Sequence, residues 1–515
     1  MASGSEPLLG DSEDVRPQGF GMGMLLGYLS KYGGRVFVAQ GDRYIIDETT
    51  DETAQLDYTE PPRAVSVLEM LYVPYLASMT IDSTCNVQVY PLFVTVQLGL
   101  SQSYIGFIEV FSGLFDLLLN STSYNDRIAK NLDWWDAQWV SCLGCALSSF
   151  MIAWSPSGNF WAICICIAAS CIVRSLTPPT PFSTFRRRWC DREDDSVGAS
   201  LQVGCRYLSV AVGVQVGITV ARLSALSFRG VFVFATVANL ILGGWSHWAS
   251  RAANPKAQRP RVSDPLRAAA SGGKATEESQ ATKWSVLYGN MDAAVTVLSF
   301  SIFTDITRST WPRTLTYVAN NSPHISPETS AHINSGCHLI SLIGIVLTPL
   351  IVDGGFARVS ADKSGLHVAA TLSFFFLTIA HGLLSQASSH VFFVCSGIAF
   401  GLGEAFSCGL RENVRMTVRR AMESQNRGDT YIKIFDNGVY VLEGIVKMAI
   451  NFSIPVFGDP RWFGMQKVSL VLCGVAAVAT LFSTRLEGTR KARTRGEPPK
   501  KRHPDTVKVV HCPCF

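Results

Sequence analysis

A few ionisable side chains stand inside long apolar stretches of this sequence, where a charge is costly. The carboxylates of Glu109, Asp116 and Glu404 and the guanidinium of Arg174 are the main examples. Apolar surroundings penalise the charged form of a carboxyl group, so such a group can take up and release a proton near working pH. An arginine in the same surroundings tends to pair with an acid or to line a cavity. These four residues are therefore our candidates for proton coupling or substrate binding.

The apolar stretches that hold these residues have the length of membrane-spanning helices. A helix needs about 20 apolar residues to cross a hydrocarbon core about 30 Å thick. About six such runs stand on each side of a basic polar segment, which is rich in Pro and Gly and is typical of a solvated linker. The expected spans are residues 65–85, 102–120, 136–154, 159–176, 200–221, 230–248, 286–306, 332–352, 366–385, 390–410, 434–455 and 466–484.

Composition agrees with a membrane protein rather than a set of soluble domains. Charged residues make up 16% of the 515 residues, against about 25% in a typical globular protein, and the mean hydropathy is +0.22. Most of the 14 cysteines lie inside apolar runs, where cysteine acts as a small hydrophobic residue. We therefore predict an all-α polytopic membrane protein of about 12 transmembrane helices in two six-helix bundles.

Charge distribution predicts the orientation of the chain. Most of the 44 Lys and Arg residues lie in the two tails, the middle loop and alternate short loops, and basic residues concentrate on the cytosolic side of membranes. Both termini are therefore expected in the cytosol, and Asn320, which opens an Asn-Asn-Ser sequon, is expected outside as a glycosylation site. The predicted parts are an N-terminal tail at 1–64, bundles at 65–248 and 286–485, a central loop at 249–285 and a basic tail at 486–515.

The loop after the second expected span carries a recognisable motif. Residues 124–130 read Tyr-Asn-Asp-Arg-Ile-Ala-Lys, which resembles the signature loop of the major facilitator superfamily, in outline G-x-L-a-D-R-x-G-R-K. Asp126, Arg127 and Lys130 match charged positions of that motif, whereas both of its Gly and its Leu are replaced. The resemblance implies that Asp126 and Arg127 hydrogen-bond neighbouring helix ends at the cytosolic face.

The second half of the chain has features similar to the same superfamily. Asp353–Arg358 is a short loop with Asp and Arg at the matching place, which fits an internal six-span repeat. Residues 315–319, LTYVA, resemble the loop between spans seven and eight in fungal members. Residues 397–411 resemble their tenth span. The resemblance covers about 65–485.

Glycine spacing predicts close contacts between helices. Gly213 and Gly217 form a G-x-x-x-G pattern on the fifth span, and Gly397, Gly401 and Gly403 lie on the tenth; small residues at such spacing let helix backbones approach one another. Proton-coupled drug exporters of the superfamily usually carry a Gly-Pro pair on span five. Its absence here weakens a specific expectation of antiport but not the expected fold.

The resemblance implies a secondary transporter whose two bundles rock about a central site. Arg174 resembles the superfamily's fourth-span arginine, which is implicated in proton coupling, although it alternatively fits a side chain that extends to the cytosolic interface. Coupling is expected through Glu109 first and Glu404 second. Asp82, near one end of its span, fits the mouth of a cavity. The similarity to fungal proteins and the 10% aromatic content favour efflux of an apolar or amphipathic drug or secondary metabolite.

Two other classes of function stay open at this stage. A transporter-like receptor or inactive paralogue fits the altered signature loop. A polytopic membrane enzyme would need a cluster of His, Asp or Glu at the membrane face, which the sequence does not offer. No Walker-type loop and no H-x-x-x-H pair on a span occurs, so we expect no enzyme activity, no cofactor and no metal.

The expected partners follow from these features. They are a small-molecule substrate, protons and the lipid bilayer, with no nucleic acid, and the protein is expected to be a monomer. The plasma membrane is the expected location, with the vacuolar membrane as the alternative.

Overall fold

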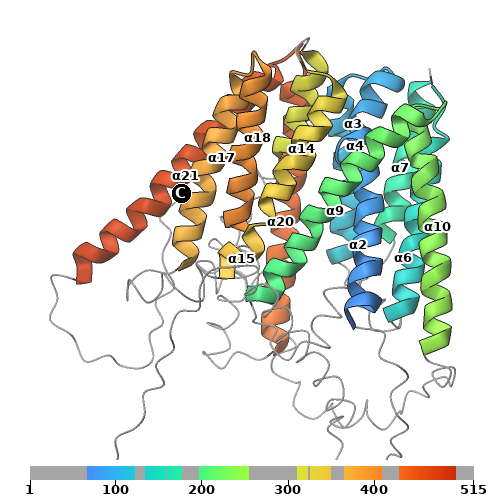
Figure 1. The fold of residues 1–515 in the computed structure, drawn as a ribbon, viewed down its shortest axis with the longest axis horizontal. Coiled ribbons are helices and arrows are strands. Elements are labelled where there is room, and N and C mark those ends of the chain that lie inside the picture. Colours follow the sequence, from blue (N-terminus) through green and yellow to red (C-terminus); the bar gives the residue numbers. More distant parts are fainter. Residues whose placement is uncertain are drawn as a thin grey trace, which may run out of the picture. The chain divides into compact units, whose positions relative to one another are not determined.

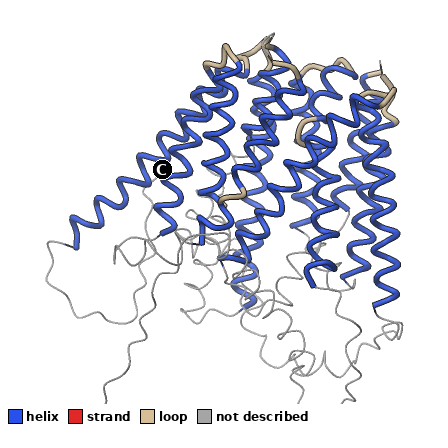
Figure 2. The backbone as a smooth tube through the Cα atoms, in the orientation of Figure 1, coloured by secondary structure: helices blue, strands red, loops and turns tan. Residues whose placement is uncertain are grey.

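A computed structural model of the protein describes residues 67–121, 134–157, 159–176, 196–253, 310–322, 325–349, 365–408 and 429–494. Apart from Val67, they all belong to one compact unit, Leu68–Phe515. Secondary structure within these ranges is entirely helical, as Figures 1 and 2 show. Outside the described residues lie the predicted tail 1–64, the signature loop with Asp126, Arg127 and Lys130, most of the central loop, the span at 286–306, and the chain beyond residue 494.

Helices in the first half lie where the apolar runs predict them, because each run is long enough to satisfy its backbone hydrogen bonds internally while it crosses a membrane. They are α2 (Val67–Asn86), α4 (Gln102–Ser121), α6 (Trp134–Ala153), α7 (Phe160–Leu176), α9 (Ser196–Leu223) and α10 (Phe228–Ala253).

The first span is longer than the sequence suggested. After a two-residue turn, α2 is followed by α3 (Val89–Leu92) and a five-residue π-helix, η1 (Phe93–Gln97). Their apolar side chains at Val89, Leu92 and Phe93 are buried, so burial extends the span beyond its predicted end at residue 85. Asp82 consequently lies near the middle of the helical stretch 67–97 rather than near its end.

The second half contains a helical segment at 310–321, then α14 (Pro327–Ser341), α15 (Gly344–Pro349), α17 (Gly365–Ser385), α18 (His390–Ser407), α20 (Asp429–Gly458) and α21 (Met465–Thr494). The predicted span at 332–352 is thus two helices that meet at a turn at residues 342–343. Residues 315–319 are helical rather than a loop, because Trp311, Leu315 and Tyr317 bury their side chains and hold the segment in the core.

Several of these helices match the thickness of a bilayer. In the described part of the chain, five helical stretches are long and apolar enough to span a membrane: Val203–Leu223, Phe228–Trp248, Val368–Ser385, His390–Ser407 and Ile434–Gly458. On α10, 20 residues separate Phe228 from the exposed Trp248, which corresponds to about 30 Å of helix. Trp154, Trp161 and Trp462 are also exposed, beside helix ends, as is typical of membrane interfaces.

The connections η1–α4, α6–α7, α9–α10 and α20–α21 lie at one end of the helices, which we call the short-loop end (Figure 2). Along the helices, the most extensive contacts join α6 with α10, α17 with both α18 and α21, and α4 with α20. The α4–α20 and α9–α14 contacts connect the two halves of the sequence. Among the described helices, these contacts, together with those of α9 with α15, hold the two halves together.

Glycines permit the closest of these approaches. A side-chain carbon at Gly213 or Gly217 would collide with the carbonyl oxygens of Thr80 and Thr84 on α2, which confirms the close packing predicted for that pair. At Gly106 on α4, such a carbon would lie 2.7 Å from the Phe452 carbonyl oxygen of α20. Gly397, Gly401 and Gly403 on α18 contact neighbouring helices in the same way. Small residues therefore set the spacing both inside the first half and between the halves.

Candidate functional site

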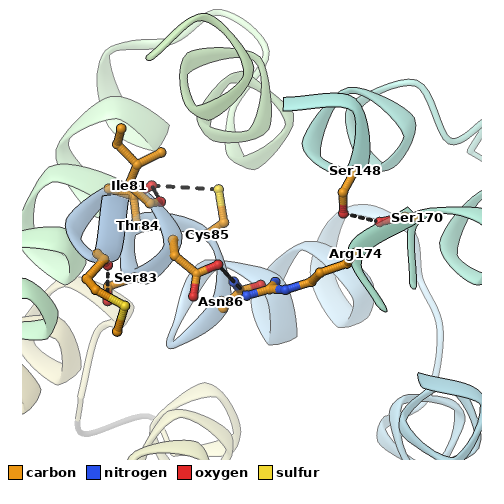
Figure 3. Close-up of polar contacts among 10 residues, drawn as sticks. Ile81, Ser83, Thr84, Cys85, Asn86, Ser148, Ser170 and Arg174 are labelled. Atoms are coloured by element: carbon orange, nitrogen blue, oxygen red, sulfur yellow. Dashed lines mark hydrogen bonds and ion pairs between the residues drawn. The ribbon is translucent and has the colours of Figure 1, made fainter. Parts of the chain in front are cut away.

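Asp82 on α2 and Arg174 on α7 form an ion pair between Asp82 Oδ1 and Arg174 Nη2. The same carboxylate oxygen accepts a second hydrogen bond, 2.6 Å long, from Nδ2 of Asn86. Residues 82 and 86 are one helical turn apart, so both face α7. Figure 3 shows the Arg174 side chain extending toward Asn86 and toward the carboxylate to which both side chains donate, that of Asp82. We call Asp82, Asn86 and Arg174 the Asp82 centre.

The two helices bring these charges to the same depth. Asp82 lies 15 residues from Gln97, the end of η1, and Arg174 lies 14 residues from Phe160, the start of α7. Both are thus 14 to 15 residues of chain away from the short-loop end, and Arg174 is in the last turn of α7. Arg174 thus pairs with Asp82 from the last turn of α7.

A narrow polar pocket surrounds the Asp82 centre. Its free space is about 20 Å³, enough for about one water molecule. The Arg174 side chain is 46% exposed and that of Asp82 is 34% exposed, so the pair borders this space rather than being sealed in apolar side chains. Water can therefore reach the carboxylate, but an organic molecule does not fit here in this conformation. The other lining residues are Ser78, Ile81, Cys85, Cys145, Ser148, Ser149, Ile152, Phe232 and Asn239.

Hydroxyl and amide groups make the pocket wall polar without adding charge. Ser148 on α6 and Ser170 on α7 are both buried, and their Oγ atoms lie 2.7 Å apart (Figure 3). Asn239 on α10 is buried as well. These groups can orient a water molecule near Asp82, whereas Arg174 balances its charge.

The remaining candidates from the sequence lie elsewhere. Glu109 and Asp116 are on α4, but their side chains are outside the described residues. Glu404 on α18 is 1% exposed, at a junction where the Tyr207 hydroxyl of α9 donates to the Glu404 carbonyl oxygen over 3.1 Å. Asn320 is exposed at the end of the helical segment 310–321. The structure thus brings Arg174 to Asp82 and places Glu404 on a different set of helices.

The sequence reasoning missed the partnership of Asp82 with Asn86 and Arg174. A usable signal was present, because the spacing Asp-x-x-x-Asn places both side chains on one face of a helix. The prediction missed this spacing because it ended the first span at residue 85, just before Asn86. In the described part of the chain, no group of three or more His, Cys, Asp or Glu side chains could hold a metal ion.

A second polar cluster joins the two halves of the chain at the short-loop end. Asp459, which follows α20, is 3% exposed, and its Oδ2 accepts hydrogen bonds from the hydroxyls of Ser101 (2.9 Å) and Ser103 (3.1 Å) at the start of α4. Its Oδ1 accepts from the Arg461 backbone N–H over 3.0 Å. We call this the Asp459 contact. A carboxylate at a helix start also interacts favourably with the helix dipole.

The environment of Asp459 keeps its carboxyl group ionised. Burial raises the pKa of this carboxyl, but hydrogen bonds from the backbone N–H groups of Arg461 and Ser103 and from the hydroxyls of Ser101 and Ser103 outweigh burial, so that the pKa lies below its ordinary value. Further contacts join the halves as well. Gln88 Nε2 donates to the Pro327 carbonyl oxygen over 2.9 Å, and Arg222 lies 3.9 Å from Glu328.

Comparison with known proteins gives matches among solved structures. No protein-family model and no curated protein matches the sequence. A variant of the nucleoside transporter NupG matches 81% of this chain and 98% of its own, with a TM-score of 0.55 and 14% identity. A variant of the peptide transporter POT matches 82% and 94%, with a TM-score of 0.56 and 14% identity. A POT family transporter in complex with 5-aminolevulinic acid matches 82% and 96%, with a TM-score of 0.55 and 12% identity.

At such identities the likeness concerns the fold. The described helices, the spans among them and these three matches agree with one another. The chain is a helical multi-pass protein with the fold of the major facilitator transporters.

Proposed function

We propose that this protein is a secondary active transporter that exports a small apolar or amphipathic organic molecule in exchange for protons. The observation that carries the proposal is the ion pair of Asp82 with Arg174, which joins α2 to α7 beside a space for water in a chain with a transporter fold. Ionisable groups within membrane-spanning helices are costly and mark ion or substrate pathways. With no ATP-binding motif in the sequence, a proton gradient is the simplest source of energy.

The Asp82 centre suggests how a proton could change the bundle. A proton that binds the carboxylate from one side of the membrane removes its charge, and the attraction between Asp82 and Arg174 is lost. Arg174 then needs a new partner, such as water or an electron-rich group of the substrate. Release of the proton to the other side restores the pair. Because Asp82 is on α2 and Arg174 on α7, each cycle alternately loosens and tightens the contact between these helices.

The composition of the spans bears on the substrate class. The aromatic content and the few charges in the spans favour an apolar or amphipathic molecule over a charged one. The matched structures are those of a nucleoside transporter, a peptide transporter and a transporter in complex with 5-aminolevulinic acid. Glu109, Asp116 and Glu404 stay candidates for further proton-binding groups, and the signature loop Asp126, Arg127 and Lys130 stays our predicted cytosolic latch.

Reconstituted vesicles test the proposed function. With a pH gradient of one unit and the membrane potential clamped, exchange of one proton per molecule can sustain about tenfold accumulation. We expect such accumulation for at least one amphipathic probe from a panel that includes rhodamine 6G and ethidium. Accumulation of labelled nucleosides or dipeptides instead would overturn the substrate class. No proton-dependent flux of any compound would favour the receptor or inactive paralogue.

Topology is tested by glycosylation. We place both termini in the cytosol, with the protein as a monomer in the plasma membrane or the vacuolar membrane. The short-loop end then faces outward, and Asn320 is its predicted glycan acceptor. Treatment with an N-glycosidase should increase the electrophoretic mobility of the wild-type protein and leave Asn320→Gln unchanged. A glycan that persists in Asn320→Gln, for example at Asn120, would contradict this orientation.

A further inference from the structure

Three polar side chains follow one another at one-turn intervals along α14: Ser330, Asn334 and His338. We call them the α14 polar stripe. A spacing of four residues places them on one face of the helix, and this face is buried, with Ser330 and Asn334 0% exposed and His338 6% exposed. The stripe lies beside the contact between the two halves of the chain, because the hydroxyl of Ser335 on the same helix donates to the Ala211 carbonyl oxygen of α9 over 2.7 Å.

Aromatic rings from both halves pack against this stripe at His338. The ring centroid of His338 is 6.1 Å from that of Tyr207 on α9 and 5.9 Å from that of Phe400 on α18. Phe400 in turn stacks on Trp311, with ring centroids 4.2 Å apart and ring planes at 10° to each other. All three aromatic side chains are buried. Sites for small organic molecules typically have this composition, in which aromatic walls surround a few polar groups.

Two polar atoms of the stripe have no hydrogen-bond partner among the described residues. They are Nδ2 of Asn334 and Oγ of Ser330. A buried polar group without a partner destabilises a fold, and such groups are rare in native proteins. Apolar side chains of the same size would therefore pack at these two positions at a lower cost. Side chains that weaken the packed structure in this way are typical of functional sites, which points to a ligand that binds them when the halves separate.

We infer that the α14 polar stripe and the rings packed on it recognise the substrate, and that they take a flat aromatic molecule with a hydrogen-bond acceptor such as a carbonyl group. The inference rests on the proposed function and narrows its substrate class. The amide of Asn334 donates to the acceptor, the rings of Tyr207 and Phe400 offer surfaces for stacking, and the hydroxyl of Ser330 offers a second polar contact. In this conformation the stripe is buried, so a molecule reaches it only when α9 moves away from α14.

Binding of two fluorescent dyes to the purified protein tests this inference without transport. Rhodamine 6G is a planar aromatic cation with an ester carbonyl group, and ethidium is a planar aromatic cation of the same charge without a carbonyl group. Asn334→Leu keeps nearly the volume of the side chain but removes the donor. It should raise the dissociation constant for rhodamine 6G about fivefold, measured by fluorescence anisotropy in detergent, and leave that for ethidium unchanged. Its thermal stability should equal or exceed that of the wild type, because a buried group without a partner has been removed.

Ser330→Ala gives an independent test with a matched control. We expect it to raise the dissociation constant for rhodamine 6G about twofold. Ser469→Ala is the control, since both hydroxyls are 0% exposed and without a partner among the described residues. Ser469 is on α21, which packs mainly against α17 and not against α14. Its substitution should therefore leave the binding of both dyes unchanged.

The outcomes separate the recognition site from the transport activity. Rhodamine 6G that binds Asn334→Leu and Ser330→Ala as tightly as the wild type would overturn the inference, whether or not the protein transports the dye. Equal weakening of both dyes in Asn334→Leu would overturn it too, because the acceptor would then not be recognised. A wild-type protein that binds neither dye would overturn the inference together with the proposed substrate class. Binding of rhodamine 6G that depends on Asn334, without proton-dependent flux in vesicles, would support the recognition site and overturn the proposed transport.

Discussion

Asp82→Asn should abolish accumulation against a gradient while downhill exchange of substrate continues. The amide keeps nearly the volume of the carboxyl group but cannot bind or release a proton, so movement of substrate is no longer tied to proton flow. In vesicles with a one-unit pH gradient, we expect the accumulation ratio to fall from about tenfold to about one. Exchange of labelled for unlabelled substrate at equal pH should persist, because binding and the movement of the halves do not require the proton.

The accumulation ratio of other variants distinguishes a residue that couples transport to protons from a residue that only stabilises the structure. Asp82→Asn leaves Arg174 without its partner, so the thermal stability of this variant must be compared with that of the wild type. The double variant Asp82→Asn/Arg174→Gln controls for the effect of an unpaired charge. Glu404→Gln and Glu109→Gln are parallel tests at our other two candidates. Uphill accumulation that survives in Asp82→Asn but disappears in Glu404→Gln would transfer the coupling role to Glu404.

A reversible cross-link at the Asp459 contact should arrest transport. Asp459 accepts hydrogen bonds from Ser101 and Ser103, which belong to the other half of the chain. These bonds must break whenever the short-loop end opens, if the two halves alternate in giving access to a central site. In the double variant Ser103→Cys/Asp459→Cys, a short bifunctional methanethiosulfonate should reduce flux to the background of protein-free vesicles.

Reduction of the cross-link should restore flux to the level of the untreated double variant. That recovery separates a mechanical block from damage to the protein. Each single variant, treated with the same reagent, controls for reaction with native cysteines such as the exposed Cys395. Full flux in a protein shown by mass spectrometry to be completely cross-linked would mean that this end of the seam between α4 and α20 does not open during transport.

Some features of the Asp82 centre were visible in the sequence, and others were not. Arg174 stood out because an isolated cation in an apolar run needs a partner or a cavity. Its partner did not stand out, because Asp82 and Arg174 are 92 residues apart and their meeting depends on how α2 and α7 are rotated and staggered. The same is true of Asp459, whose role depends on a contact with Ser101, 358 residues away.

The sequence alone determined the helical, membrane-spanning character of the chain, the place of most spans and the suitability of Gly213 and Gly217 for a close helix contact. These are local properties, since the length of an apolar run and the size of a side chain do not depend on distant residues. Tertiary structure decided the extension of the first span through η1, the helical form of residues 310–321 and the partners of Asp82 and Asp459. Each of these depends on burial against other helices, and burial is a property of the packed chain rather than of any one segment.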